Sequence, residues 1–254
     1  MGTLTGKTAV VVGASGTENF GTAIARKFAA EGAHVVVSAR RLEPLEALAA
    51  DIGGKAVACD VAQEDSIANL FKEASEATGS VDIAVFSAGI HAPVAIAELS
   101  VETIQPSLDV SFIGALLFFK HAAAVMPNGG SVIVVSSLTA RIPGPGLSVY
   151  ASARAGIDYG IKVAAWEYAA QKVRFNSIAA GLIKTDMTGM LFDMAPVVEA
   201  HIQNTPSGRM GTVDDMAEAA LFLADDKRSG YINAQVLDLA GGQQNGALPR
   251  FEGL

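Results

Sequence analysis

Short apolar runs alternate along the chain with longer segments whose apolar residues recur at helical spacing. Most of the short runs are nearly continuous Val, Ile and Ala, which is typical of parallel strands buried on both faces. The runs that predict strands are residues 9–12, 35–38, 56–59, 83–86, 132–135, 174–178 and 235–239.

The segments between these runs predict helices at residues 22–31, 42–51, 67–78, 101–126, 149–171 and 213–223. Regular alternation of strands and helices predicts an α/β fold, with one Rossmann-like, doubly wound parallel sheet and right-handed crossovers. We interpret residues 1–254 as a single catalytic domain. Residues 185–206 break the alternation close to the predicted strand ends, so they predict a mobile substrate lid.

The charge and composition narrow the classes of partner. The chain has 254 residues, a formal net charge of −8 and one cysteine, Cys59. Without a cluster of Lys or Arg, we expect neither nucleic acid nor an anionic membrane as a partner. No apolar run approaches the roughly 20 residues that span a bilayer, and the chain opens with a short polar stretch, so we expect a cytoplasmic protein. Four scattered histidines give no metal-binding pattern.

The predicted helix at residues 149–171 is apolar on more than one side. A helix of this kind must be covered twice, and the sheet can cover only one side. The pattern therefore predicts a homo-oligomer, either a tetramer or a dimer. The alternative is that the chain's own C-terminal segment covers the second side.

A glycine-rich segment joins the first predicted strand to the first predicted helix. It contains Gly13, Ser15, Gly16 and Gly21. Glycine permits a tight turn and lets backbone amides approach a pyrophosphate, and the helix N-terminus adds oriented N–H groups and partial positive charge. The position at the first strand–helix junction predicts a dinucleotide site, with an ordinary tight turn as the alternative.

The end of the second predicted strand bears on the choice between NADP(H) and NAD(H). The residues there read SARR and include Arg40 and Arg41. A carboxylate at this place would bind the ribose 2′-hydroxyl of NAD(H), whereas an arginine accommodates the 2′-phosphate of NADP(H). The sequence therefore favours NADP(H), unless both arginines are solvated loop residues.

The next two strand ends carry further candidate cofactor residues. Asp60, followed by Val61, can accept a hydrogen bond from an adenine amino group, or can serve as a turn residue. Ser87, Ala88 and Gly89 end the fourth predicted strand, and their small size allows the cofactor to pass closely.

With these features in place, the chain resembles the short-chain dehydrogenase/reductase family from residue 6 to residue 242. The resemblance rests on the glycine segment, Asp60, the small residues at 87–89, and the spacing Ser137-x12-Tyr150-x3-Arg154. It also rests on RFNSIAAGLIKTDM at 174–187, on residues 208–226 and on LAGG at 239–242. It implies a seven-stranded sheet in the order 3-2-1-4-5-6-7, helices on both faces, a nicotinamide cofactor and often a tetramer.

The resemblance also implies roles for particular residues. Ser137, Tyr150 and Arg154 fall on the catalytic positions and Ser111 falls on the position of the family's catalytic asparagine. Tyr150 and Arg154 also fall on positions that contact the cofactor. The segment with Gly181, Ile183 and Thr185 matches the part of the family that binds the nicotinamide carboxamide.

Three departures from the family pattern bear on the chemistry. The glycine segment from Gly13 to Gly21 is longer than usual and resembles that of the enoyl reductases and halohydrin dehalogenases. Ser111 replaces asparagine and Arg154 replaces lysine. Because arginine does not deprotonate, Arg154 cannot take the lysine's part in a proton relay.

The catalytic residues can support carbonyl–alcohol chemistry. Tyr150 and Arg154 are four residues apart on a predicted helix and therefore share a face. A tyrosine with an ordinary pKa near 10 needs a nearby cation to act as a base at neutral pH, and Arg154 can supply that charge. Ser137 can donate a hydrogen bond to the carbonyl oxygen. We therefore expect an NADP(H)-dependent oxidoreductase.

Two other functions stay open. A Ser-Tyr-Arg set resembles that of the halohydrin dehalogenases, which use it without a cofactor to close an epoxide. Against this, Gly13, Arg40, Asp60 and Thr185 keep the features of a dinucleotide site. A degenerate nucleotide-binding protein is the other alternative.

The substrate end is predicted from its apolar composition. We expect a small-molecule substrate with a secondary alcohol or ketone on a hydrophobic body. His91 and Arg141 lie near the predicted wall, where they can contact a polar group or serve as surface residues. The apolar lid residues are Met187, Met190, Leu191, Phe192 and Met194.

Overall fold

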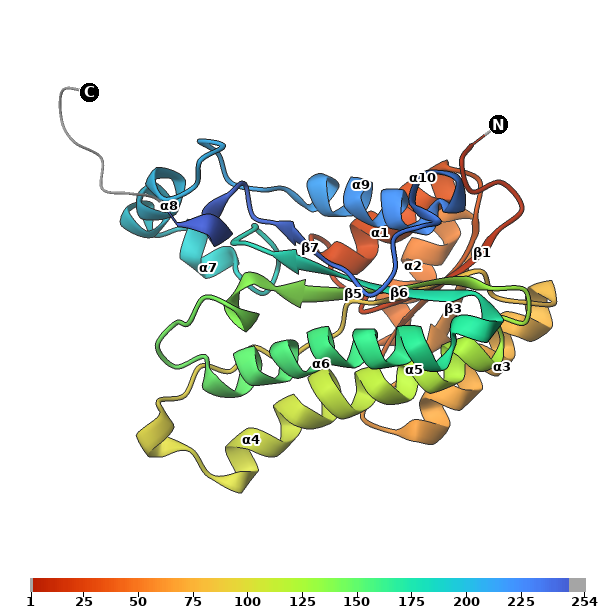
Figure 1. Ribbon diagram of the computed structural model, residues 1–254, viewed down its shortest axis with the longest axis horizontal. Helices are drawn as coiled ribbons and strands as arrows, with labels where there is room; N and C mark the ends of the chain where they lie inside the picture. Colours follow the sequence, from red (N-terminus) through yellow and green to blue (C-terminus); the bar gives the residue numbers. More distant parts are fainter. Residues whose placement is uncertain (1, 247–254) are drawn as a thin grey trace.

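Seven parallel strands form one sheet in the order β3-β2-β1-β4-β5-β6-β7, as predicted (Figure 1). The computed structural model describes residues 2–246; residues 1 and 247–254, which the predicted domain included, lie outside the described part. The strands are β1 (Thr8–Val12), β2 (His34–Ala39), β3 (Lys55–Ala58), β4 (Ile83–Phe86), β5 (Gly130–Ser137), β6 (Val173–Ala180) and β7 (Val236–Leu239).

Helices cover both faces of this sheet (Figure 1). One face carries α3, α5 and α6, and the other carries α1, α2 and α9. The helices are α1 (Phe20–Ala30), α2 (Leu42–Ile52), α3 (Glu64–Thr78), α4 (Val101–Leu108), α5 (Gly114–Ala124), α6 (Ser148–Glu167), α7 (Gly189–Phe192), α8 (Ala195–Gln203), α9 (Val213–Ala224) and α10 (Asp226–Ser229).

The stretch from Ala9 to Val12 in β1 is continuously apolar because both faces of the strand are buried. In β1, Val10 and Val12 pack into the core under α3, α5 and α6, whereas Ala9 and Val11 pack under α1, α2 and α9. Side chains alternate between the faces of a strand, so both sets of positions in this stretch are apolar.

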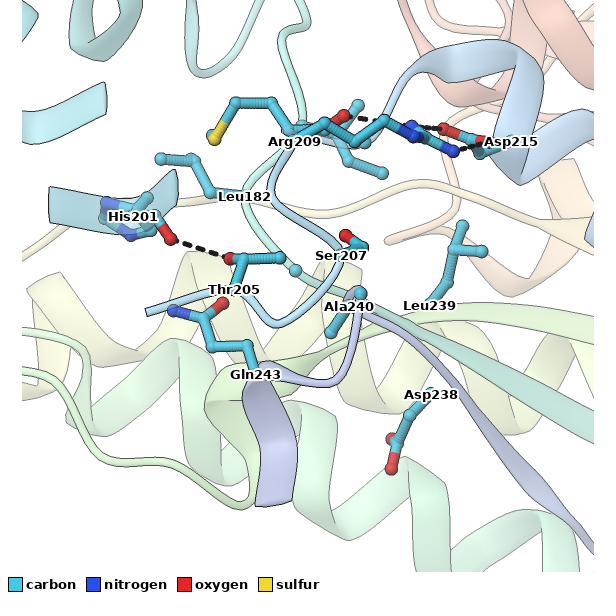
Figure 2. A pocket seen from close by; sticks show the side chains of 15 residues that line it. Leu182, His201, Thr205, Ser207, Arg209, Asp215, Asp238, Leu239, Ala240 and Gln243 are labelled. Carbon is cyan, nitrogen blue, oxygen red and sulfur yellow. Dashed lines mark hydrogen bonds and ion pairs between the residues drawn. The ribbon is translucent and has the colours of Figure 1, made fainter. Parts of the chain in front are cut away.

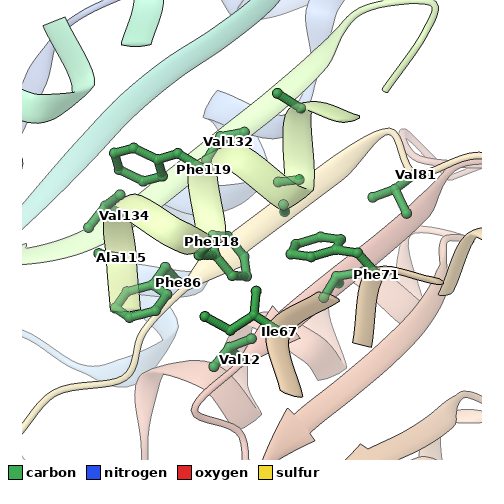
Figure 3. Packing of buried hydrophobic residues seen from close by; sticks show 14 of the residues in the cluster. Val12, Ile67, Phe71, Val81, Phe86, Ala115, Phe118, Phe119, Val132 and Val134 are labelled. Carbon is green, nitrogen blue, oxygen red and sulfur yellow. The ribbon is translucent and has the colours of Figure 1, made fainter. Parts of the chain in front are cut away.

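An aromatic cluster forms the centre of the core on the α3, α5 and α6 side (Figure 3). The ring of Phe118 lies edge-on to Phe71 and Phe86, with centroids 5.0 and 5.2 Å apart. Edge-to-face pairs of this kind stabilise a core beyond their area burial. The cluster fixes α5 against the sheet directly behind the strand ends.

The predicted helix at 101–126 is correct in extent but not in regularity. The π-helical turn Asp109–Ile113 separates α4 from α5. Gly114, which follows it, lies so close to the carbonyl of Val61 that a Cβ there would collide with it. A π turn inserts one residue and so changes the direction of neighbouring side chains. Apolar periodicity did not reveal this turn.

The predicted end of the helix at 149–171 is also wrong. Helix α6 ends at Glu167, and Ala169–Gln171 form a separate 3-10 turn before Lys172, whose φ is 60°. A left-handed residue cannot continue a right-handed helix, so the chain turns there into β6. The other predicted boundaries differ by only a few residues.

The helical stretch that contains α4 and α5 is more apolar than the search for continuous apolar runs indicated. Val101–Ala124 is long and apolar enough to cross a membrane by length and composition alone, and 44% of its most apolar window is buried within the protein. A core helix has the same composition. Phe118 and Phe119, two of the apolar residues of this stretch, pack in the core of the protein.

Two short helices, α7 and α8, occupy the predicted lid at residues 185–206. Figure 1 shows them together at the end of the sheet toward which β5 and β6 point. The lid therefore stands over the carboxyl ends of the strands, where open α/β sheets bind ligands.

Candidate functional site

A cleft of about 1220 Å³ runs across the carboxyl ends of the central strands. Most of the predicted site residues line it. Those residues are Gly13, Ser15, Gly16, Arg40, Arg41, Asp60, Val61, Ser87, Ala88, Gly89, Ser137, Tyr150, Arg154, Gly181, Ile183 and Thr185. Gly21 and Ser111 are absent from the lining.

The glycine segment is pressed against the end of β4. Gly13 has a φ of 89°, and a Cβ there would lie 2.7 Å from Ser87 Oγ and 3.0 Å from Ala88 N. Gly21 lies beneath, where a Cβ would come within 2.6 Å of the Gly13 carbonyl oxygen. Ser87 Oγ donates to the Val12 carbonyl at 2.7 Å. The backbone of the loop therefore packs directly against the end of β4. We call the part of the loop that lines the cleft, Gly13, Ser15 and Gly16, the glycine cradle.

The helix after this loop begins at the cleft. Asn19 caps α1 by accepting a hydrogen bond from Thr22 N at 2.8 Å, and Thr22 Oγ1 donates to the Gly16 carbonyl at 2.8 Å. Asn19 and Phe20 line the cleft. The N-terminus of α1 thus adds its partial positive charge to the cradle. We did not predict Asn19, although Asn-x-x-Thr before an apolar helix is a capping signal.

The long glycine loop also reaches the lid. The Asp186 carboxylate accepts hydrogen bonds from Thr17 Oγ1 and Glu18 N, both at 3.3 Å. Asp186 N donates to the Glu18 carbonyl at 2.8 Å. The additional residues of the loop therefore hold the first turn of the lid. Asp186 was not predicted, because its partners are far away in the sequence.

Both candidate arginines lie where β2 ends. Arg40 and Arg41 are both exposed, and both line the cleft. Arg41 Nη2 donates to the Ser15 carbonyl at 3.0 Å, which ties the arginine to the glycine loop. Two cationic side chains thus stand at one end of the cleft.

Asp60 has a structural partner as well as a place in the cleft. Its Oδ1 accepts a hydrogen bond from Ala62 N at 3.1 Å, and its own N–H donates to Ser66 Oγ at 3.1 Å. This is the turn arrangement that we gave as the alternative to adenine recognition. Asp60 nevertheless lines the cleft.

Arg154 is a buried charged residue of the cleft lining. Its side chain is 4% exposed. Nη1 donates to the Val135 carbonyl at 3.0 Å, and Nη2 donates to the Ala88 carbonyl at 3.1 Å. Gly89 makes room for the guanidinium, since a Cβ there would collide with Nη2. The Nε atom is buried without a partner, and a buried donor of this kind favours a ligand that accepts.

Tyr150 lies between two nitrogen-bearing side chains. The guanidinium carbon of Arg154 is 5.2 Å from the centre of the Tyr150 ring. On another side, the ring of His91 lies edge-on at 5.3 Å. Burial lowers the pKa of His91, so this histidine is neutral at physiological pH. Arg154 therefore supplies the positive charge next to the phenol.

Ser137 and Ser111 take different positions. Ser137 lines the cleft, and its Oγ accepts hydrogen bonds from Thr139 Oγ1 at 2.9 Å and Thr139 N at 3.2 Å. Ser111 is fully buried in the π turn and accepts from Ile90 N at 3.3 Å. Ser111 thus supports the loop after β4 and does not face the cleft.

The end of the cleft next to the lid is lined largely by apolar residues, although not every predicted lid residue contributes. Phe192 and Met194 do not line it. Arg141 also lies outside the lining and forms an ion pair with Asp238. The apolar residues at this end are Ile142, Pro143, Leu147, Met187, Met190, Leu191 and Val197.

A smaller cavity of about 200 Å³ adjoins the cleft beside the lid (Figure 2). The two share Gly181, Leu182, Ile183, His201 and Gln243. Several of its polar side chains are already paired within the protein. Thr205 Oγ1 donates to the His201 carbonyl at 2.7 Å, and the guanidinium of Arg209 binds both oxygens of Asp215 at 2.7 and 2.8 Å. We describe this cavity as a side chamber of the cleft.

Known proteins share this architecture. A family model described as enoyl-(acyl carrier protein) reductase matches residues 13–244. The 3-oxoacyl-[acyl-carrier-protein] reductase of Homo sapiens is 34% identical over 234 residues, covering 90% of this chain and 95% of that protein. An uncharacterized oxidoreductase of Mycobacterium bovis is 35% identical over 246 residues, covering 94% and 98%. The crystal structure of a putative short-chain alcohol dehydrogenase from Sinorhizobium meliloti has a TM-score of 0.89 at 29% identity, covering 96% and 98%.

Fold, site and relatives define an oxidoreductase built on a dinucleotide-binding sheet. The chain belongs to the short-chain dehydrogenase/reductase family. Its members act on carbonyl and alcohol groups, and the fold implies a nicotinamide dinucleotide cofactor. The glycine cradle and the unpaired Nε of Arg154 fit such a cofactor.

Proposed function

We propose that this protein is an NADP(H)-dependent oxidoreductase that interconverts a ketone and a secondary alcohol on a largely apolar substrate. One observation carries the proposal. A single cleft joins the glycine cradle and two arginines at one end to Tyr150, its guanidinium neighbour and an apolar chamber at the other.

The cofactor assignment follows from the arrangement at the end of β2. The backbone of Gly13, Ser15 and Gly16 and the N-terminus of α1 would hold the pyrophosphate. Arg40 and Arg41 line the cleft at the end of β2 and would pair with a ribose 2′-phosphate; Arg41 Nη2 already donates to the Ser15 carbonyl. When bound, the nicotinamide supplies or accepts a hydride.

The protein's own residues handle the proton and the oxygen atom. In reduction, the Tyr150 hydroxyl gives its proton to the oxygen of the former carbonyl; in oxidation, the phenolate takes the proton of the alcohol. Arg154 holds its guanidinium carbon 5.2 Å from the centre of the Tyr150 ring, so a positive charge stands beside the reacting group. The Ser137 hydroxyl can donate to the same oxygen, since its Oγ only accepts in its present hydrogen bonds with Thr139.

Halide elimination stays as the second candidate, and one observation favours it. The guanidinium of Arg154 contacts the Tyr150 ring in a Ser-Tyr-Arg set that resembles the halohydrin dehalogenases. The intact cradle at Gly13, with its φ of 89° and no side chain between loop and β4, supports the dinucleotide reading instead.

We also propose a homo-oligomer. Tyr159, Val163 and Trp166 project from α6 with 67%, 45% and 84% of their surface exposed. Apolar side chains at this density on one helix favour cover by a second copy of the chain. The molar mass in solution tests this part of the proposal.

Titration with NADPH and NADH, followed by nicotinamide fluorescence, tests the function directly. We expect NADPH to bind more tightly and to reduce hydrophobic ketones. Failure of both cofactors to bind, together with halide release from a vicinal halohydrin, would replace the proposal with the second candidate.

A further inference from the structure

The loop after β4 carries a histidine for which the proposed reaction has no role. His91 lines the cleft, and its ring lies edge-on to that of Tyr150, with the ring centres 5.3 Å apart and the planes at 83°. Burial lowers the pKa of His91, so the imidazole beside the Tyr150 phenol is neutral at physiological pH. A neutral imidazole has one nitrogen that donates a hydrogen bond and one that accepts.

Neither ring nitrogen of His91 has a hydrogen-bond partner among the residues that the structure describes. Other polar side chains of the same lining do have partners. Thr139 Oγ1 donates to Ser137 Oγ at 2.9 Å. His201 Nδ1 donates to the Val197 carbonyl at 2.9 Å. The two nitrogens of His91 are therefore available to a ligand in the cleft.

The protein fixes the loop on both sides of this histidine. Ile90, directly before His91, donates its N–H to Ser111 Oγ at 3.3 Å. Three residues after the histidine, Val94 N donates to the Gly146 carbonyl at 2.9 Å, in the segment that leads into α6. Ser111, which departs from the family pattern, thus supports the segment that carries the imidazole.

The cleft wall around the imidazole includes several apolar side chains. Pro93 from the same loop, and Ile142, Pro143 and Leu147 from the loop before α6, line the cleft together with His91. A ligand that brings only apolar groups here would remove water from the imidazole and leave it without a partner. A ligand with a hydroxyl group would replace that water, so the site favours the second ligand over the first.

We infer that the substrate carries a hydroxyl group on the carbon next to the reacting carbonyl, and that His91 binds this hydroxyl. The substrate class is then an α-hydroxyketone with a hydrophobic body, and the reduced form is a vicinal diol. The inference rests on the proposed function and narrows it. Because the imidazole lies beside Tyr150, it is placed to bind a group adjacent to the reacting carbon. A hydroxyl both donates and accepts, which matches the neutral imidazole.

Two ketones that differ by one methyl group test the inference. They are 1-hydroxy-2-heptanone and its methyl ether, 1-methoxy-2-heptanone, each offered with NADPH. Both carry an electron-withdrawing oxygen next to the carbonyl, but only the first has an O–H group. We expect kcat/KM for the hydroxyketone to exceed that for the ether about tenfold, the effect of one hydrogen bond.

Replacement of the histidine provides the matched variants. His91→Phe keeps a ring beside Tyr150 and has no nitrogen, so the ratio of the two kcat/KM values should fall from about ten to about one. His91→Gln has an amide that donates and accepts, so it should keep the preference for the hydroxyketone. The control variant His121→Phe makes the same replacement on α5, outside the cleft lining, and should leave the ratio unchanged.

The outcomes separate this inference from the proposed function. Equal kcat/KM values in the wild-type protein, or a ratio that His91→Phe does not change, would overturn the inference and leave the oxidoreductase intact. A preference that His91→Phe abolishes and His91→Gln keeps would support it. Thermal unfolding shows whether each variant is folded, and His91→Leu replaces His91→Phe if that variant is not. If neither ketone is reduced with NADPH or NADH, the proposed function itself fails, and the inference fails with it.

Discussion

The dinucleotide end and the substrate end of the cleft are built in different ways. Around the glycine loop, backbone meets backbone: added Cβ atoms on Gly13 and Gly21 would come within 3 Å of neighbouring atoms. Around the lid, Met187 and Met190 are half-exposed or more, on short helical turns. The first end is rigid and specific in shape, and the second is adaptable.

This difference shows where selectivity for each ligand resides. A fixed cradle recognises one ligand through backbone position and tolerates almost no substitution. A chamber of flexible apolar side chains recognises polarity and approximate size. Tyr150 and Arg154 stand between the two ends, so substitutions there test both at once.

The largest effect is expected at this junction. Tyr150→Phe removes the hydroxyl that exchanges a proton with the substrate oxygen, so kcat should fall by about 10³-fold, within the range for general acid–base groups. The dissociation constant for NADPH should stay nearly unchanged. Steady-state kinetics and fluorescence titration measure the two quantities. An active Tyr150→Phe enzyme would contradict the assignment.

Next in size is the loss of the buried guanidinium. Arg154→Met leaves the carbonyls of Ala88 and Val135 unpaired, so the free energy of unfolding should fall by about 2 kcal/mol. Activity should fall as well, because the cation beside Tyr150 is lost. Arg154→Lys keeps a cation but has one nitrogen to reach two carbonyls, so it should recover activity more than stability. Urea denaturation and kcat/KM distinguish these effects.

The dinucleotide end alone is tested by its arginines. The variants Arg40→Ala and Arg41→Ala each remove a charge available to a 2′-phosphate. A hydrogen bond to a charged group contributes about 1.5–3 kcal/mol, so the dissociation constant for NADPH should rise roughly 10- to 100-fold for whichever arginine makes the contact. NADH, which lacks that phosphate, serves as the matched control. Equal weakening of both cofactors would show a structural role.

A smaller effect is expected at the substrate end. Met190→Ala removes an exposed thioether from the lid, and neighbouring methionines can adapt to the space. We expect KM for a bulky hydrophobic ketone to rise only several-fold, with kcat and NADPH binding unchanged. A change as large as that at Tyr150 would mean that the lid is as rigid as the cradle.

The smallest effect concerns stability and pH beside the side chamber. Arg209 and Thr212 hold the pKa of Asp215 well below its usual range. The ionised form is therefore favoured by folding, and its contribution is present above pH 4 and is lost as pH falls below that value. Asp215→Asn should lower the denaturation midpoint at pH 7 and have a smaller effect near pH 2. Thermal unfolding at both pH values measures the difference.

The sequence predicted features that follow a local pattern, such as strands and motif spacing. It did not predict features that depend on contacts between residues far apart in the chain. The strands of the sheet and the order of the cofactor residues follow from apolar runs and motif spacing. The π turn at Asp109–Ile113 depends on the close approach of Gly114 to Val61. The hydrogen bonds between Asp186 and Thr17 join positions far apart in the sequence, and no local pattern announces them.

The guanidinium of Arg154 connects the ends of two neighbouring strands, β4 through Ala88 and β5 through Val135, and it fits only because Gly89 has no side chain. The space at residue 89 and the side chain at residue 154 are therefore coupled. A Cβ at 89 would push the end of the guanidinium away from its present place, so the effects of substitutions at the two positions are not expected to add.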